Sequence, residues 1–185
     1  VDAGVSFEKQ MDSVGAVADA SAKQMNRLRE QALKLGQDTA YSASQAAEAQ
    51  GELVKGGIKV KDVIGGALPA ALSLAAAGEI DLASAAETTA NAMQLFGLQG
   101  KQASHVSDLL ATAANKTTAD VEDFAMALKQ GGAVAKLAGY DIDQTVTTLE
   151  ALAAAGIKNS DAGTSMKTAF IQLLKPTEKQ AALTK

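Results

Sequence analysis

Apolar side chains recur along this chain at spacings of three and four residues, which is the spacing of one face of an α-helix. From Ser21, Met25, Leu28, Ala32 and Leu35 follow this spacing. The period-two runs of β-branched and aromatic residues that mark strands do not occur. The pattern predicts an all-α fold: a compact multi-helix bundle of about ten short helices joined by Gly-rich turns, with no sheet.

Capping residues and glycines predict where these helices begin and end. The expected segments are Ser21 to Gly36, Ser42 or Ser44 to Gly56-Gly57, Asp81 to Gly97, about Lys101 to Asn115, Thr117 or Thr118 to Gly131-Gly132, a short piece through Leu137 to Gly139, Asp141 to Gly156, and Ser160 to Lys175-Pro176. Asp141 with Gln144 has the form of a capping box. In the last segment, one apolar stripe is expected to comprise Met166, Phe170, Leu173 and Leu174.

Three of these helices end alike, with an apolar run, a glycine and a further apolar residue. The three ends are Leu53 to Ile58, Leu74 to Ile80 and Leu152 to Ile157. We expect a Schellman-type stop in each, with the glycine at positive φ. The spacings between the three ends are unequal, which argues against a regular solenoid of fixed period.

The amino-acid composition indicates that the core contains few large side chains. Hydrophobic residues make up 47% of the 185 residues, but alanine accounts for roughly a fifth of the chain, well above ordinary usage. Alanine lets helices approach closely and contributes little apolar area. We therefore expect a closely packed core with few large side chains, in a domain that gains stability from a partner or from self-association.

Charge and cysteine content exclude several classes of protein. The net charge is −4 and no cysteine is present, so disulfide scaffolds and thiolate metal sites are excluded, and direct binding of nucleic acid is not expected.

No residue pattern supports catalysis, a cofactor or a metal. His105 is the only histidine, and no partner is placed beside it. Asp141 and Asp143 form a D-x-D pattern without the other residues of a calcium loop, and helix capping explains it better. Ser6 to Lys9 matches S-x-x-K without its companion motifs. We expect no enzymatic activity, no cofactor and no metal ion.

The longest uncharged stretch runs from Val63 to Gly78. It is shorter than the roughly 20 apolar residues that span a bilayer and rich in small residues, so a buried helix is expected. A membrane-active helix, packed through its small residues, is the alternative.

Taken together, these motifs resemble the core region of phage tail tape measure proteins over about Ser6 to Thr177. The residues that carry the resemblance include Gly57, Leu68-Pro69-Ala70, Leu74 to Gly78, Asp81-Leu82-Ala83, Phe96-Gly97-Leu98, Asp108 to Ala111, Gly132 to Ala135, Leu152 to Ile157, and Ala162-Gly163-Thr164. The family-motif structural positions are accordingly Gly57, Pro69, Gly78, Phe96, Gly97, Gly132, Gly156, Ala162 and Gly163.

The resemblance implies a structural phage tail protein that is not an enzyme. Such a protein determines tail length during assembly, occupies the tail tube and is released ahead of the DNA during genome ejection. The resemblance implies a homo-oligomer in the tail interior of the virion and in the host cytoplasm during assembly. Its implied partners are the tail tube protein, tail tip or baseplate hub proteins and tail assembly chaperones. The alternative is a membrane-active helical protein that helps to form a DNA-delivery channel, with host membrane contact after ejection.

We expect one tape-measure core-like helical domain over residues 1–177, followed at 178–185 by the start of a further helix or by a linker. The chain begins at Val1 without an initiator Met, so we expect it to be a piece of a longer protein.

Overall fold

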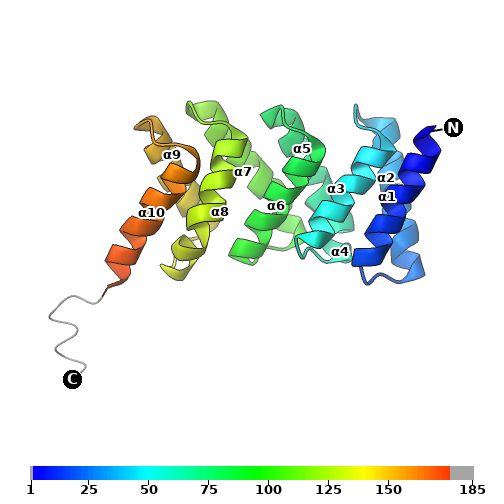
Figure 1. Ribbon diagram of the computed structural model, residues 1–185, viewed down its shortest axis with the longest axis horizontal. Helices are drawn as coiled ribbons and strands as arrows, with labels where there is room; N and C mark the ends of the chain where they lie inside the picture. Colours follow the sequence, from blue (N-terminus) through cyan, green and yellow to red (C-terminus); the bar gives the residue numbers. More distant parts are fainter. Residues whose placement is uncertain (1, 176–185) are drawn as a thin grey trace, which may run out of the picture. The chain divides into compact units, whose positions relative to one another are not determined.

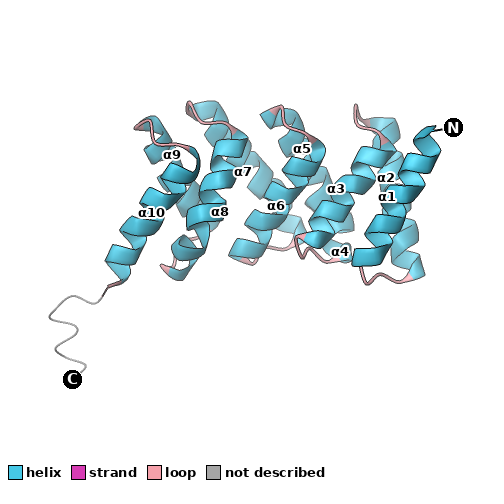
Figure 2. Ribbon diagram, in the orientation of Figure 1, coloured by secondary structure: helices cyan, strands magenta, loops and turns pink. Residues whose placement is uncertain are grey.

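The computed structural model describes residues 2–175, and within them the chain is helical with short connections and no strand (Figure 2). The all-α prediction is thereby confirmed. The expected helix or linker at 178–185 lies outside the described residues. In chain order the elements are α1 (Asp2–Val17), α2 (Ala22–Asp38), α3 (Ala43–Lys55), α4 (Val60–Asp62), the π-helix η1 (Val63–Ala67), α5 (Leu68–Gly78), α6 (Leu82–Phe96), the 3-10 helix η2 (Gly100–Gln102), α7 (Ala103–Lys116), α8 (Val121–Leu137), α9 (Ile142–Ala154) and α10 (Asn159–Leu174).

Most of the expected N-terminal caps are present. Ser21, Ser42, Asp81 and Asp141 each accept a hydrogen bond from a backbone N–H three residues later. Such a bond satisfies one of the N–H groups that the first helical turn leaves without a partner. The predicted capping box of Asp141 and Gln144 is confirmed.

Two predicted helix starts are wrong. The N-cap of α8 is Asp120 rather than Thr117 or Thr118, because the Thr117 hydroxyl instead bonds the backbone around the end of α7. The N-cap of α10 is Lys158 rather than Ser160, and the first backbone bond of that helix runs from Ala162 N to Lys158 O.

Schellman-type stops with a positive-φ glycine end α3 and α9 as predicted, and α6 ends in the same way at Gly97, but the expected positive-φ glycine at the end of α5 is wrong, because Gly78 does not have a positive φ. Gly57, Gly97 and Gly156 have φ of 87°, 70° and 84°, a region that glycine enters without steric cost. At α3, the amides of Gly57 and Ile58 bond Val54 O and Leu53 O, which is the paired pattern of this motif.

Several other glycines lie where the pattern did not predict them. Gly36 lies inside α2, and Gly131 and Gly132 lie inside α8, which continues to Leu137 and closes at Gly139. The separate short piece ending there does not exist. Gly78 is the last residue of α5, and Glu79 takes the left-handed conformation in its place.

The helical glycines avoid close contacts. A Cβ on Gly36 would lie 2.5 Å from Ala43 N, and one on Gly131 would lie 2.5 Å from Gly163 O. These two positions need glycine because a side chain would not fit, whereas a helix stop needs glycine because φ is positive there.

The described chain divides into two compact units, Val1–Ala111 and Thr112–Lys185. The expectation of one domain over residues 1–177 stays a prediction. In the first unit, α3 packs against α1 on one side and α6 on the other, while α2 packs on α3 and α5 packs on α6 (Figure 1). Alanines recur in its buried core, among them Ala46, Ala47 and Ala86.

In the second unit, α8 and α10 lie side by side and α9 packs against both (Figure 1). Met166 and Phe170 of α10 are buried, and the Phe170 ring lies 4.4 Å from the Tyr140 ring. The predicted apolar stripe is buried only in part, because Leu173 and Leu174 are 74% and 51% exposed.

The helices recur with a nearly constant period. The N-cap residues Ser42, Asp81, Asp120 and Lys158 follow one another at intervals of 39, 39 and 38 residues. The expectation that no fixed period exists is therefore wrong, because the three similar ends lie at different positions within the repeat: Gly57 follows α3, whereas Gly78 and Gly156 lie at the ends of α5 and α9. Recurrence at this length is typical of helical-hairpin repeats.

Candidate functional site

The residues with catalytic potential do not come together in the structure. Within residues 2–175, no three His, Cys, Asp or Glu side chains lie so that they could hold a metal ion. His105 lies exposed on α7. Asp141 is occupied as the N-cap of α9, so the D-x-D pattern is helix capping.

Charged groups act locally at helix ends. The Ser84 hydroxyl and backbone N–H donate to Asp81 and hold the pKa of that carboxyl below its usual value. The bond from Lys55 Nζ to Glu52 Oε1, 2.8 Å long, raises the pKa of the exposed Lys55. Both groups therefore stabilise their own helices.

Two family-motif positions meet in the first unit. Gln94 Nε2 donates to Gly57 O over 2.6 Å, and Gly57 and Gly97 both border one hollow of about 580 Å³, part of it open solvent. Its lining is mainly polar and backbone, from Gly57, Ile58, Lys59, Lys61, Asp62, Met93, Gln94, Gly97, Leu98 and Gln99. A Cβ on Gly57 would lie 2.8 Å from Gln94 Nε2, so this glycine serves both the turn and the contact.

A close backbone contact next to Asp62, one of the lining residues, involves Gly66 and Gly100, which the sequence analysis did not single out. Asp62 Oδ1 accepts from Gly100 N over 3.2 Å, and a Cβ on Gly66, which has φ of 157°, would lie 2.5 Å from Gly100 O. The Gly65-Gly66 pair ahead of Pro69 was the available signal, because paired glycines mark a backbone that turns sharply or approaches another.

Pro69, Gly78 and Phe96 hold structural places in the same unit. Pro69 lies in the first turn of α5, where its missing N–H has no helical partner to lose. Gly78 ends that helix, and Phe96 is buried at the end of α6. These three positions therefore shape helix ends.

The remaining family-motif positions lie in the second unit. Gly156 ends α9, and Gly132 is buried within α8. Ala162 and Gly163 are buried on α10, where a Cβ on Gly163 would lie 2.4 Å from Ala127 O. This contact lets α8 and α10 approach backbone to backbone.

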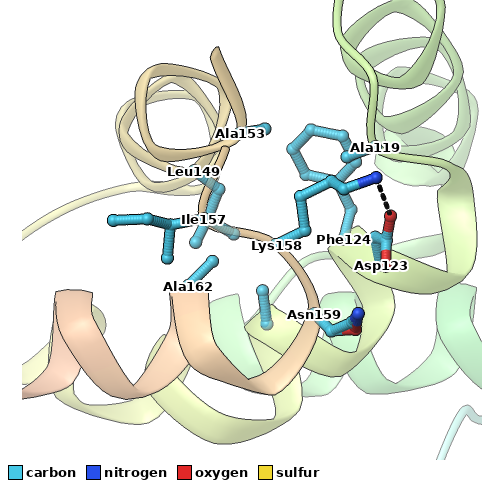
Figure 3. A pocket seen from close by; sticks show the side chains of 10 residues that line it. Ala119, Asp123, Phe124, Leu149, Ala153, Ile157, Lys158, Asn159 and Ala162 are labelled. Atoms are coloured by element: carbon cyan, nitrogen blue, oxygen red, sulfur yellow. Dashed lines mark ion pairs between the residues drawn. The ribbon is translucent and has the colours of Figure 1, made fainter. Parts of the chain in front are cut away.

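A small apolar hollow lies between α8, α9 and α10 (Figure 3). It measures about 160 Å³, part of it open solvent, and is bordered by Phe124, Leu149, Ala153 and Ile157 among others. At its edge Lys158 Nζ donates to Thr118 O over 2.8 Å and lies 3.8 Å from Asp123 Oδ2. We interpret the hollow as a packing gap closed by Lys158, since its lining supplies few polar groups that could orient a ligand.

The uncharged stretch belongs to a longer helical segment than predicted. Val60–Gly78 covers 19 residues with a mean hydropathy of 1.4, long and apolar enough to cross a membrane, and half of it is buried within the structure. The segment is interrupted at Gly66, whose φ and ψ are not helical.

Comparison with known proteins gives one consistent answer. A family model described as phage-related minor tail protein matches residues 29–185. The tape measure protein of Pneumococcus phage Dp-1 is 38% identical over 178 residues, which are 96% of this chain and 15% of that protein. The probable tape measure protein of Escherichia phage P2 is 36% identical over 170 residues, which are 92% of this chain and 21% of that protein. The chain therefore spans about a fifth or less of the length of these relatives. No solved structure matches.

Proposed function

We propose that this chain, which belongs to the phage-related minor tail protein family, is one folded segment of a tape measure protein with a structural role in a phage tail. The observation that carries the proposal is the similarity over nearly the whole chain to two proteins named as tape measure proteins. The packing of α8 and α10 is consistent with it, because glycine and alanine at that contact serve helix packing.

The full protein would determine tail length, but this segment would contribute little to the ruler. As one continuous helix, 185 residues would measure about 280 Å at about 1.5 Å per residue. The longest helices, α2 and α8, have 17 residues each, or about 26 Å. We propose that this segment docks or anchors the protein, and that longer helices elsewhere set the length.

We further propose a place and partners for this segment. It would act as a tape-measure core-like domain in the tail interior, as part of a homo-oligomer that contacts the tail tube protein and the tail tip or baseplate hub. Tail assembly chaperones would bind the protein in the host cytoplasm, and the protein would leave ahead of the DNA. We propose no enzymatic role for this segment.

Electron microscopy of purified virions tests this placement. An epitope tag joined to the chain within the full-length protein should be detected in detergent-opened tails and by mass spectrometry of purified tails. Tails that lack every peptide of this chain would contradict the proposal.

A membrane-active role is the second candidate, and Val60–Gly78 is the observation that favours it. If this segment leaves its packed position, the chain should release dye from liposomes, and Leu72→Asp should abolish release because a carboxylate is costly in hydrocarbon. Ser73→Asp, at an exposed position of the same segment, should abolish release as well while leaving the packed core intact, which separates the cost of the carboxylate in hydrocarbon from loss of folding. Absence of release by the unaltered chain under any ejection-like condition would remove this candidate.

A further inference from the structure

The five helices α1, α3, α6, α8 and α10, which follow the 39-residue period, share one burial register. One core position is buried in every copy: Phe7, Ala46, Ala85, Phe124 and Ala162. A second core position, four residues later, is also buried in every copy: Met11, Gln50, Thr89, Leu128 and Met166. The helices α1, α3, α6, α8 and α10 can therefore be compared position by position.

A third position of this register, eleven residues after the first, breaks the pattern at the last copy. It is held by Ala18, Phe96 and Ala135, which are 7%, 5% and 0% exposed. The second copy has Gly57 there, which carries no side chain. In α10 the equivalent residue is Leu173, which is 74% exposed. A large apolar side chain thus lies uncovered at a position that is buried in every earlier copy that carries a side chain there, while Gly57 of the second copy is exposed.

Ile171, close to Leu173 on α10, is also exposed, but for a different reason. Ile171 is 40% exposed, and its register equivalents Ala16, Lys55, Gln94 and Ala133 are exposed as well. Exposure of Ile171 is therefore a property of this register, whereas exposure of Leu173 is an exception to it.

We infer that Leu173 marks a docking face for one more helical hairpin of the same repeat, supplied by the same polypeptide beyond the printed sequence. Within each unit, successive helices of this register already pack against each other, as α1, α3 and α6 do and as α8 and α10 do. The relatives are about five to seven times longer than the part that this chain matches. The next helix of this register lies about 39 residues after α10, and the hairpin that carries it covers Leu173, since each repeat of such an array contacts its neighbours. This inference rests on burial, on the period and on the length of the relatives, and it does not depend on the proposed role in a tail.

The absence of cysteine from the chain permits a direct test. Leu173→Cys and, as the matched control, Ile171→Cys are made in the 185-residue chain and in the chain extended along its natural reading frame to full length. Maleimide labelling rates are then compared. A third variant, Ala135→Cys, reports the rate of a fully buried position.

In the 185-residue chain, Leu173→Cys should react about as fast as Ile171→Cys. In the full-length protein its rate should fall by about tenfold or more, because a covered thiol reacts only through local opening, while Ile171→Cys stays unchanged. Equal reactivity of Leu173→Cys in both chains would overturn the inference. Protection that rises with the concentration of the 185-residue chain would also overturn it, since a second copy would then be the occupant.

Discussion

Gly163 of α10 faces Ala127 of α8 so closely that a Cβ on Gly163 would lie 2.4 Å from the Ala127 carbonyl oxygen. The obstacle is backbone, which cannot turn away as a flexible side chain can. Glycine at this position therefore sets the distance between the two helices, and the second unit depends on it.

Gly163→Ala should destabilise the protein by about 1–3 kcal/mol, the usual cost of forcing extra volume into a packed core. Gly4→Ala is the control, because nothing lies within 4 Å of a Cβ there, and alanine should stabilise the helix by about 0.5–1 kcal/mol. Urea unfolding followed by circular dichroism measures both variants. A Gly163→Ala variant as stable as the parent would show that α8 and α10 can separate at no cost.

Glycine has two roles in this fold, and they decide which helix boundaries could be predicted from the sequence. At Gly57, Gly97 and Gly156 the glycine is a stop, and the adjacent apolar residue signals it. At Gly36 and Gly131 the helix continues, because those glycines make room for a partner backbone. A single sequence shows the glycine but not the partner, so the two roles look alike.

In the candidate site, too, the local turns could be predicted from the sequence, whereas the way they come together could not. The turns at Gly57 and Gly97 were predicted one by one, but their meeting at Gln94 depends on how α3 packs against α6. The repeat was detectable from Ser42, Asp81 and Asp120, whose spacing is constant. The three similar helix ends hide the period, because Gly57 ends α3, whereas Glu79 and Gly156, each two residues before the next N-cap, end α5 and α9.

Two buried threonines should respond to valine in opposite ways. Thr89 and Thr145 are both 0% exposed on helices. Thr145 Oγ1 donates to Asp141 O over 2.6 Å, whereas Thr89 Oγ1 has no hydrogen-bond partner among the described residues. An unsatisfied buried polar group costs about 1–3 kcal/mol.

Thr89→Val should therefore raise the free energy of unfolding by up to about 1 kcal/mol, and Thr145→Val should lower it by about 1 kcal/mol. Chemical denaturation of the two variants side by side gives the comparison. A loss of stability in Thr89→Val as large as that in Thr145→Val would mean that the Thr89 hydroxyl is satisfied in solution.

Asp81 should make the stability of the first unit depend on acid pH. Its pKa in the folded protein lies below the ordinary value of 3.8, chiefly because Ser84 donates to the carboxylate. A group whose pKa is lowered by folding stabilises above its unfolded pKa, and this contribution is lost as pH falls through the folded pKa. The contribution should be fully present at neutral pH and decline below about pH 4.

Asp81→Asn keeps a capping oxygen and should remove this acid-dependent part while leaving most of the cap. Asp81→Ala should cost about 1 kcal/mol at neutral pH, as the loss of an N-cap does. Thermal unfolding of the three proteins between pH 2.5 and 7 measures both effects. Parallel pH profiles for the parent and Asp81→Asn would rule out Asp81 as a source of the dependence.

The most direct test of the account is the length of tails assembled with a full-length protein that lacks residues 2–175 and keeps both flanks. If the segment docks or anchors the protein, electron micrographs should show a severe loss of assembled tails, and the few that form should keep nearly normal length. If the segment is part of the ruler, assembly should stay efficient and tails should be shorter by about 260 Å, at about 1.5 Å for each deleted residue. That proportional shortening would contradict the account.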